Sequence, residues 1–314
     1  MITKENVDID TVCWLAGSYG QDSNMKADNY YLPETLDEMT ELCRKLYSQN
    51  KHFDLVGHTS NLYFRPNYKT ENLISTRRLN KWEDRDDAVQ CECGVSVRRL
   101  SSAMIRQGVE GFAGLVDLPG TVAAGIYGNA GCFGCSLSDL LKSLTLLKPN
   151  GDIEELIPAE MRFRHRSSCL KRREMRGVIL SVKLKKVYGD LEQVNLQAQR
   201  NHEIRKNTQP GPNNNLGSVF CGCDNLTIKG VVIKAVSAVF ANLMHPKVKS
   251  EDLYREKTEI ACKLMNRKEL AKFLPYGFNR YIWNTPEAHR LFDSYVDALG
   301  SIYKNPKLEI EIRG

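Results

Sequence analysis

The sequence predicts an α+β protein built from more than one domain. Segments with the alternation of apolar and polar residues that is typical of strands lie between segments with the periodicity of amphipathic helices. The chain has 314 residues, of which 42% are hydrophobic, so it can fill two or three separate cores. Neither an internal repeat nor a low-complexity segment interrupts this pattern.

Three helices are predicted from apolar spacing and end signals. The first covers residues 36–46 and starts with a capping box that begins at Thr35. The second covers 97–108, and the third covers 285–300 with Pro286 in its first turn. The apolar face of the third helix consists of Leu291, Phe292, Tyr295, Val296 and Leu299.

Five strands are predicted between and after these helices. Residues 53–56 form a short apolar run that ends at a glycine, and residues 89–93 alternate between apolar and polar types. Residues 144–147 and 178–184 are rich in leucine and β-branched residues, and residues 308–313 alternate as a single closing strand. Strands and helices therefore follow one another in a mixed order.

The ten cysteines show no regular framework of spacings. Three close pairs have no histidines at the distances that a zinc site needs; these pairs are Cys91/Cys93, Cys132/Cys135 and Cys221/Cys223. We therefore expect free thiols in a reducing cytoplasm and no metal centre.

Charge and hydropathy limit the partners. The net charge of +6 suits an anionic ligand, but acidic and basic residues are interspersed, so the composition does not call for nucleic acid. The first ten residues are charged and lack the apolar core of a secretory signal. The longest apolar run, 231–244, contains Lys234 and is too short to cross a bilayer. We expect a cytoplasmic protein that contacts neither nucleic acid nor a membrane.

Residues 111–134 are the most distinctive stretch, with seven glycines and almost no charge. Pro119 fixes one φ angle and Gly120 can supply a positive one, so a tight turn is predicted there. The small residues that follow allow a flat ligand or a phosphate to approach the main-chain N–H groups. The alternative is a closely packed glycine turn in a core, which glycine content alone would favour.

The order of residues in this stretch resembles the flavin-binding loop of the UDP-N-acetylenolpyruvoylglucosamine reductase (MurB) family. The family pattern is close to G-(I/L)-P-G-(T/S)-V followed by N-A-G-x-(Y/F)-G; residues 117–122 and 129–134 follow it, with Asp117 in place of the first glycine. The resemblance implies non-covalently bound FAD. The FAD contacts it implies here are Leu118, Pro119, Gly120, Thr121, Ala124, Gly125, Asn129, Ala130 and Gly131.

A second cofactor loop follows the strand at 53–56. The family carries G-x-G-S-N-(L/V) there, to hold the pyrophosphate of FAD, and this chain has Gly57, His58, Thr59, Ser60 and Asn61. Thr59 replaces a glycine, and we expect it to narrow the anion cradle because threonine tolerates positive φ poorly. His58 is interpreted as an ordinary residue of a phosphate loop, since it lies one position away from a covalent flavin link in related flavoenzymes.

The basic segment 161–173 contains a candidate substrate residue. Residues 163–171 resemble the family's F-x-Y-R-x-S-x-F-K, in which the arginine contacts the enolpyruvyl carboxylate, and Arg166 matches it. Arginine suits a carboxylate because its planar fork can pair with both oxygens. His165 and Leu170 depart from the pattern. Arg162, Arg172 and Arg173 are interpreted as a solvated basic loop.

Ser218 is the candidate proton donor. The family has R-x-x-T-Q-P, a short loop and then G-S-(V/F)-F-K-N-P, and the matching residues here are Arg205, Thr208, Gln209, Pro210, Gly217, Ser218, Val219 and Phe220. A serine taken alone is more often a cap or turn residue. The match ends at Cys221-Gly222-Cys223, which removes an asparagine that the family uses near its substrate, and residues 224–278 have no counterpart.

Glu311 is the third candidate catalytic residue. Residues 308–313 resemble the family's closing L-E-x-E-(V/I)-R, in which the second glutamate is catalytic. The alternative is an edge strand whose outward carboxylates keep it soluble. The helix before the strand also matches the family, which favours Glu311 over Glu309 as the functional carboxylate.

The resemblance covers residues 36–220 and about the last thirty residues, and it implies a fold. That fold is a two-part FAD-binding domain of the vanillyl-alcohol-oxidase/MurB type, followed by a smaller α+β substrate domain. The expected parts are residues 1–70 with 300–314, then 71–206, and then the divergent 207–299. The segment between 184 and 205 is too short for the tyrosine-bearing loop of one branch, so the chain resembles the shorter branch.

The activity implied is an NAD(P)H-linked, FAD-dependent reduction of an enolpyruvyl sugar nucleotide in peptidoglycan precursor synthesis, by a monomer or weak homo-oligomer. One alternative is a flavin oxidoreductase of the same fold that acts on another nucleotide sugar in surface-polysaccharide synthesis. Another is a flavoprotein that binds a partner without turnover, although a binding module would not need Arg166, Ser218 and Glu311 together.

Overall fold

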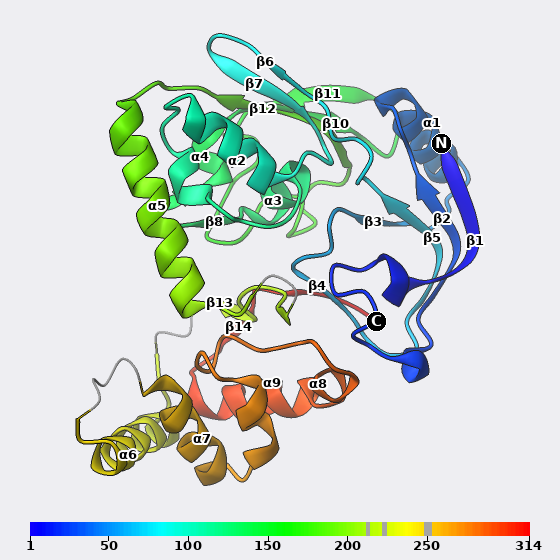
Figure 1. Ribbon diagram of the computed structural model, residues 1–314. Helices are drawn as coiled ribbons and strands as arrows, with labels where there is room; N and C mark the ends of the chain where they lie inside the picture. Colours follow the sequence, from blue (N-terminus) through cyan, green and yellow to red (C-terminus); the bar gives the residue numbers. More distant parts are fainter. Residues whose placement is uncertain (212–213, 222–224, 248–252) are drawn as a thin grey trace. The chain divides into compact units, whose positions relative to one another are not determined.

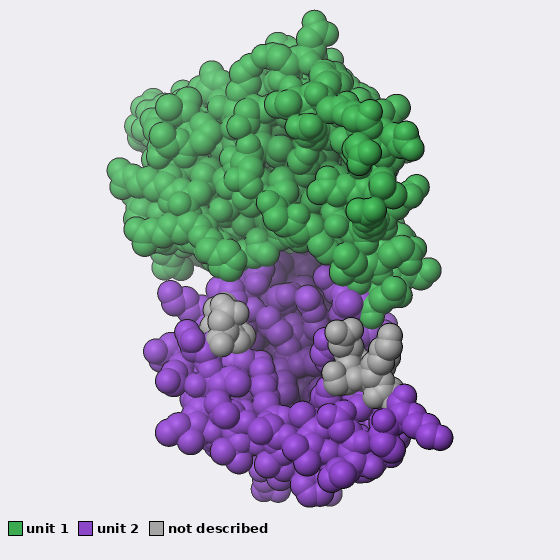
Figure 2. All heavy atoms as spheres, turned by 90° about the vertical axis from the view of Figure 1, so that its left-hand side faces the viewer, with its two compact units in different colours: residues 1–9, 25–59, 68–207 green, residues 10–24, 60–67, 208–314 purple. Residues whose placement is uncertain are grey.

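The computed structural model describes residues 1–211, 214–221, 225–247 and 253–314 (Figure 1). These residues form two compact units, which Figure 2 shows in different colours. Unit 1 contains residues 1–9, 25–59 and 68–207, and unit 2 contains residues 10–24, 60–67 and 208–314. The three-part division expected from the sequence stays a prediction.

Unit 1 begins with a four-stranded sheet in the order β1-β2-β5-β3. The strands are β1 (Ile2–Asp8), β2 (Lys26–Leu32), β5 (Lys69–Ser75) and β3 (Asp54–Val56). β1 and β2 are antiparallel, whereas β2, β5 and β3 run parallel. β3 is parallel to β5 at this edge of the sheet, and its last residue, Val56, pairs with Ser75. The chain continues from the carboxyl end of β3 into Gly57.

The helix α1 (Leu36–Ser48) follows β2 as predicted. Thr35 is its N-cap, and the hydroxyl of Thr35 accepts a hydrogen bond from the backbone N–H of Glu38 at 3.2 Å. The Glu38 carboxylate accepts from the N–H of Glu34 instead of Thr35, so only half of the predicted capping box forms. Apolar residues of α1, including Met39 and Leu46, pack on Ile74 and on residues of the second sheet.

The second sheet of unit 1 is antiparallel, with the order β11-β10-β12-β7-β6. Its strands are β11 (Ile153–Leu156), β10 (Leu141–Leu147), β12 (Val178–Lys185), β7 (Ala88–Glu92) and β6 (Trp82–Asp84). The helices with it are α2 (Val97–Arg106), α3 (Val122–Gly128), α4 (Leu137–Leu140) and α5 (Leu191–Thr208). One hydrophobic cluster joins the strands to α2 and α3, so the glycine-rich stretch is built onto a packed core.

Unit 2 is mainly helical (Figure 1). Its helices are α6 (Ile228–Met244), α7 (Tyr254–Leu264), α8 (Pro286–Arg290) and α9 (Phe292–Ile302). Its strand pairs are short: β4 (Leu62–Phe64) with β15 (Glu311–Arg313), and β13 (Phe220–Cys221) with β14 (Lys307–Leu308). Among the described residues, none of the helices is both long enough and apolar enough to cross a membrane.

The single helix predicted at 285–300 is divided into α8 and α9. Thr285 caps it as predicted, accepting from the N–H of Ala288 at 3.3 Å. Leu291 ends α8 and precedes α9 with a ψ of 1°, far from the helical value of about −42°. The hydrogen bond from the N–H of Leu291 to the carbonyl of Glu287 still forms at the break. The apolar spacing continues across this break of one residue, so the spacing alone could not predict two helices.

The prediction of one strand over residues 308–313 was wrong. β14 ends at Leu308 and β15 begins at Glu311. Between them, the N–H groups of Glu309 and Ile310 both donate to the carbonyl of Val219, and the N–H of Glu311 donates to the carbonyl of Asn61. The chain changes its pairing partner here, which an alternating pattern of residues does not encode.

The core of unit 2 is an aromatic cluster. Its fully buried members are Tyr63, Tyr281, Trp283, Phe292 and Tyr295. His289 lies in this cluster, with its ring stacked on Tyr19 at a centroid distance of 3.8 Å. Its Nε2 atom lies 3.0 Å from the hydroxyl oxygen of Ser18. Burial lowers the pKa of His289 to about 4.

We expect unit 2 to lose stability below pH 6.5 because of His289. Between pH 6.5 and 4, the histidine of the unfolded chain binds a proton whereas the folded one stays neutral, so protonation favours the unfolded state. The free energy of unfolding is therefore unaffected by His289 above pH 6.5. It decreases as the pH drops towards 4, by about 3 kcal/mol at most. Urea unfolding at several pH values should show this slope, and His289→Phe should flatten it. His245→Gln is the control within the same unit, and an equal slope in His289→Phe would contradict the assignment.

Candidate functional site

The turn at 118–121 in unit 1 adopts the conformation that its residues predict. Gly120 has a φ of 103°, which a side chain would oppose. Thr121 is the N-cap of α3 and accepts from the N–H of Ala124 at 3.4 Å. The carbonyl of Gly120 accepts from the N–H of Val97 at 3.1 Å. The turn is therefore anchored to the start of α2 and held rigidly.

The two loops implied to hold FAD meet in unit 1. A Cβ atom on Gly57 would lie only 2.5 Å from Oγ1 of Thr121. Thr121 is buried with a stiff branched side chain, so this approach requires glycine at position 57. The loop after β3 and the loop before α3 thus form one close-packed surface. The residues present fit a flavin nucleotide, which needs a backbone that can be approached closely.

Other glycines of the stretch are explained by packing. A Cβ on Gly125 would lie 2.2 Å from Cδ1 of Leu137, and one on Gly131 would lie 2.3 Å from the carbonyl oxygen of Cys135. Both glycines therefore permit contacts within the protein itself. Ala124, by contrast, is exposed, and Ala130 is half-buried. Close packing within the protein therefore explains why Gly125 and Gly131 are glycines. A ligand can still lie beside Ala124.

Thr59 takes a backbone conformation that favours glycine. Its φ is 57°, in the left-handed region that a β-branched residue rarely enters. Its side chain is turned back, and Oγ1 donates to the carbonyl of His58 at 2.7 Å. Burial and the nearby Arg77 lower the pKa of His58, so this imidazole is neutral at pH 7. The loop therefore carries backbone strain at Thr59.

We expect Thr59→Gly to raise the free energy of unfolding of unit 1 by about 1 kcal/mol. Relief of the left-handed strain stabilises the folded state by about 1 to 3 kcal/mol. The greater conformational entropy of glycine in the unfolded chain offsets about 0.5 to 1 kcal/mol of this gain. Urea unfolding should show a higher midpoint. Thr59→Ser, which removes the β-branch but keeps the hydroxyl, is expected to lie between the two. A lower midpoint for the glycine variant would show that the threonine is not strained.

The division of the chain into units falls inside the 57–61 loop. Gly57, His58 and Thr59 belong to unit 1, whereas Ser60 and Asn61 belong to unit 2. In unit 2, the side-chain amide of Asn61 donates to the carbonyl of Glu309 at 3.1 Å. Asn61 therefore supports the closing segment of the chain as well as being a candidate FAD contact.

Arg166 lies against the end of the glycine-rich stretch. Arg164 and Ser167 exchange backbone hydrogen bonds of 2.9 and 3.1 Å, which makes a tight turn with Arg166 at a φ of 53°. The Nη2 atom of Arg166 donates to the carbonyl of Gly131 at 2.6 Å, and Nη1 donates to that of Asn129 at 3.4 Å. A long side chain in the left-handed region is uncommon and concentrates at functional sites. The geometry links the candidate substrate arginine to the candidate flavin loop.

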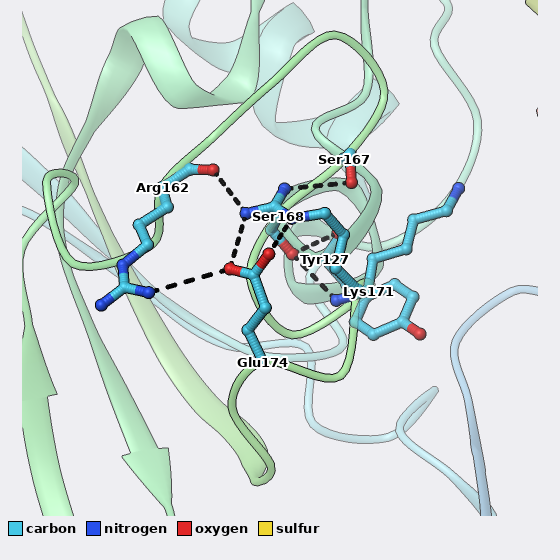
Figure 3. Close-up of polar contacts among 7 residues, drawn as sticks. Tyr127, Arg162, Ser167, Ser168, Lys171 and Glu174 are labelled. Carbon is cyan, nitrogen blue, oxygen red and sulfur yellow. Dashed lines mark hydrogen bonds and ion pairs between the residues drawn. The ribbon is translucent and has the colours of Figure 1, made fainter.

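A polar network holds the loop that carries Arg166 (Figure 3). Nε of Arg172 donates to the Glu174 carboxylate at 2.7 Å, and Nη2 of Arg172 donates to the carbonyl of Arg162 at 2.9 Å. Ser168 donates to the carbonyl of Tyr127, in α3, at 2.6 Å. The prediction that Arg172 belongs to a solvated loop was wrong, because the side chain of Arg172 is only 18% exposed. Arg162 and Arg173 are exposed, as predicted.

The segments that carry Ser218 and Glu311 meet within unit 2. Val219, next to Ser218, accepts from the N–H groups of Glu309 and Ile310. The N–H of Glu311 donates to the carbonyl of Asn61 at 3.0 Å, and a Cβ on Gly217 would lie 3.7 Å from Oδ1 of Asn61. Segments that are distant in sequence therefore converge around Asn61. The catalytic roles of these residues stay predictions.

Two residues next to Ser218 were missed by sequence reasoning. Nη1 of Arg280 donates to the hydroxyl oxygen of Ser218 at 3.0 Å. The side chain of Asn279 pairs with the backbone N–H and carbonyl of Phe220 at 2.8 and 2.7 Å. Both follow the unmatched segment 224–278, and no spacing connects them to Ser218. Gly222 and Cys223, where the family has other residues, lie outside the described residues.

In the described part of the chain, no cluster of three or more histidine, cysteine or acidic side chains could hold a metal ion. The nine described cysteines are free thiols. Burial raises the pKa of several of them, for example that of Cys91 to about 12. These buried thiols are therefore protonated and unreactive at neutral pH.

Comparison with known proteins agrees with this geometry. A family model described as an FAD binding domain matches residues 27–157. UDP-N-acetylenolpyruvoylglucosamine reductase of Bacillus pumilus (strain SAFR-032) is 28% identical over 195 residues, and that of Bacillus subtilis (strain 168) is 29% identical over 195 residues. Each alignment covers 62% of this chain, and the chain spans 64% of the length of these relatives.

The fold likeness extends further than the sequence likeness. The crystal structure of UDP-N-acetylenolpyruvylglucosamine reductase (MurB) from Thermus caldophilus matches 100% of this chain and 100% of that chain, with a TM-score of 0.67 and 18% identity. The predicted α+β fold of the vanillyl-alcohol-oxidase/MurB type is therefore confirmed. The chain therefore contains a match to an FAD binding domain over residues 27–157 and is similar to UDP-N-acetylenolpyruvoylglucosamine reductases in sequence and in fold.

Proposed function

We propose that this chain is an NAD(P)H-linked, FAD-dependent reductase that converts an enolpyruvyl UDP-sugar to UDP-N-acetylmuramate for cell-wall precursor synthesis. The observation that carries the proposal is the guanidinium of Arg166, bonded to Gly131 and Asn129 at the end of the flavin loop. FAD, when bound, supplies hydride transfer between NAD(P)H and the substrate. The residues of the chain supply binding, orientation and protons.

Arg166 binds the carboxylate of the enolpyruvyl group in this proposal. A guanidinium has five N–H donors, so two bonds to backbone carbonyls can fix its plane while it still pairs with a carboxylate. The network of Arg172 and Glu174 holds the loop in which Arg166 lies. Charge that develops on the substrate carboxylate during reduction would then meet a cation already in place.

Ser218 delivers the proton to the α-carbon of the substrate. Its oxygen accepts a hydrogen bond from Arg280, so its own hydrogen points elsewhere. A cation beside a hydroxyl stabilises the alkoxide that remains after proton transfer, which makes the hydroxyl a better acid. Arg280 therefore supports the role of Ser218 as a positioning and charge-stabilising residue.

Glu311 stabilises the charge that forms next to the carboxylate, and it does so while protonated or sharing a proton. Its backbone is fixed by the parallel pairing of β15 with β4, in which Glu311 is opposite Leu62. The side chain is half-buried. A neutral acid donates a hydrogen bond to an enolate without adding repulsion.

A related candidate is reduction of another nucleotide sugar by the same chemistry. The sequence alignments cover 62% of the chain, whereas the fold likeness covers 100% of it. Arg280 beside Ser218 lies just after the segment for which the sequence offers no family counterpart. A change of residues around a kept proton donor changes what is bound more readily than the reaction itself.

One experiment tests cofactor and substrate in turn. The purified protein should be yellow and should release FAD, not FMN, on denaturation; a colourless protein that cannot be reconstituted with FAD would refute the proposal. Oxidised protein should then change its flavin spectrum when titrated with UDP-N-acetylglucosamine enolpyruvate at micromolar concentrations. Binding of a different nucleotide sugar in its place would select the second candidate.

The remaining proposals concern the setting of the reaction. We infer a cytoplasmic protein, because a nucleotide sugar and NAD(P)H are both metabolites of that compartment. We propose a monomer or weak homo-oligomer, and a three-part organisation of residues 1–70 with 300–314, 71–206 and 207–299. Sedimentation at several protein concentrations measures the oligomeric state, and a concentration-independent dimer would contradict it.

A further inference from the structure

Cys132 and Cys135 lie directly opposite each other in a tight hairpin of unit 1. The hairpin consists of β8 (Gly131–Cys132) and β9 (Cys135–Ser136), and Cys132 is paired with Cys135 in the antiparallel register. Phe133 and Gly134 form the turn, with φ angles of 47° and 78°. Two consecutive positive φ angles are typical of the type I′ turn, which places the flanking residues in direct opposition.

The two side chains emerge on the same face of the hairpin. Sγ of Cys132 donates to the carbonyl of Gly114 at 2.8 Å. A Cβ on Gly114 would lie 2.6 Å from Cβ of Cys135, and one on Gly111 would lie 3.7 Å from its sulfur. Opposed residues of antiparallel strands have Cα atoms about 4.5 to 5.5 Å apart. That separation lies within the range of about 4.4 to 6.8 Å that a disulfide needs.

A cation lies next to one of the two thiols. Nη2 of Arg205, in α5, donates to Sγ of Cys132 at 3.0 Å, and the guanidinium lies 5.5 Å from the ring centre of Phe133. A neighbouring arginine favours the thiolate, which is the reactive form of cysteine. Burial raises the pKa of both thiols, that of Cys135 to about 11, and at Cys132 Arg205 and then Arg166 partly oppose this effect. The contact with Arg205 makes Cys132 the attacking thiol of the two.

The hairpin is also accessible to a small reagent. Cys132 and Cys135 are half-buried, and Gly134 at the tip is exposed. Among the other described cysteines only Cys221 is half-buried; the buried ones are Cys13, Cys43, Cys91, Cys93, Cys169 and Cys262. Among the described cysteines, a small disulfide should therefore reach this hairpin and Cys221 but not the six buried thiols.

We propose that Cys132 and Cys135 form a reversible intramolecular disulfide by exchange with a small-molecule disulfide. The Cys132 thiolate attacks one sulfur of the reagent and displaces a thiolate. The Cys135 thiolate then attacks the sulfur of Cys132 and displaces the second one. Two protein thiols are oxidised, one small disulfide is reduced to two thiols, and the two protons pass to the released thiolates.

The pair is connected to the site proposed for the substrate. The carbonyl of Gly131, which directly precedes Cys132, accepts the shorter hydrogen bond of Arg166. Oxidation takes the Cys132 sulfur away from Gly114 and Arg205, so the redox state of the hairpin acts on the loop that fixes Arg166. This consequence rests on the proposed function, whereas formation of the disulfide does not.

Peptide mass measurement tests the pair directly. Trypsin should release residues 107–142 as one peptide, which contains Cys132 and Cys135 and no other cysteine. Protein incubated with glutathione disulfide, quenched with acid and alkylated should yield this peptide lighter by two hydrogen atoms and without label. Cys135→Ser should instead stop at a glutathione adduct on Cys132. Arg205→Gln should slow the reaction roughly tenfold, as one pKa unit changes the thiolate fraction.

Several outcomes would overturn the proposal. The first is a wild-type peptide in which both cysteines are alkylated, because neither reacted with glutathione disulfide. The second is a wild-type peptide that keeps a glutathione adduct, and the third is a disulfide between two chains. Cys221→Ser is the control and should behave as the wild type. The readout does not depend on bound flavin or on turnover, so failure of the proposed function and failure of this inference are distinguishable.

Discussion

Replacing Arg166 by lysine should slow reoxidation of the flavin by the enolpyruvyl substrate by roughly 10²- to 10³-fold, the usual loss when a donor to developing charge is removed. Lysine keeps the positive charge but has a single ammonium group, so it cannot pair with both carboxylate oxygens. Stopped-flow absorbance at the flavin band measures this step separately from reduction by NAD(P)H, which should change little.

The alternative role of Arg166 is to anchor its loop, because it donates to the carbonyls of Gly131 and Asn129. FAD content and both half-reactions therefore have to be measured for the variant. Arg164→Lys is the matched control, since Arg164 lies in the same turn with an exposed side chain. Parallel loss of FAD and of both half-reactions in the Arg166 variant would identify a purely structural residue.

Ser218→Ala should slow the substrate half-reaction by roughly 10²- to 10⁴-fold, the range for loss of a general acid. Reduction by NAD(P)H should stay close to the wild-type rate, because Ser218 acts only on the carbon that receives the proton. The same stopped-flow measurement separates the two steps. The solvent isotope effect on substrate reduction should also change, since the proton then comes from another source.

Two variants calibrate that result. Ser301→Ala removes a hydroxyl elsewhere in unit 2 that donates to the carbonyl of Ala298 in its own helix, and should be neutral. Arg280→Gln keeps the Ser218 hydroxyl but removes the cation beside it, so a smaller loss is expected. Equal loss of both half-reactions in Ser218→Ala would point to a structural role for this serine.

Local signals predicted much of unit 1. Thr35 and the apolar spacing after it predicted α1, and the run before Gly57 predicted β3. The helix α2 and the strands β7, β10 and β12 also lie where their patterns predicted them. In these elements, propensity, periodicity and end signals agree, so short windows of sequence suffice.

Other features depend on contacts between distant residues, and the sequence could not supply them. The closing segment is interrupted between β14 and β15, where the N–H groups of Glu309 and Ile310 donate to the carbonyl of Val219. Val219 lies ninety or more positions earlier in the chain. Arg280 reaches Ser218 across 62 positions, and no motif connects them. Thr59 adopts the conformation of a glycine against its own preference, which only surrounding structure can impose.

The candidate site was predicted from motifs, not from local physics. Gly57 and Thr121 were assigned to separate loops, and the structure shows that they touch. Arg166 was assigned to the substrate, and the structure adds its bonds to the flavin loop. Residue type alone favoured the ordinary alternative at Ser218, so the functional assignment there depended on its neighbours in the motif.

The discontinuity of unit 2 has a consequence for folding during synthesis. Residues 10–24 and 60–67 leave the ribosome early, but the rest of their unit begins at Thr208. β4 can pair with β15 only after nearly 250 further residues have been made, and closing so long a loop is slow. The aromatic ring of Tyr63 therefore cannot pack against Trp283 and Phe292 until those residues are translated. Until then the ring is exposed to solvent or shielded by other proteins.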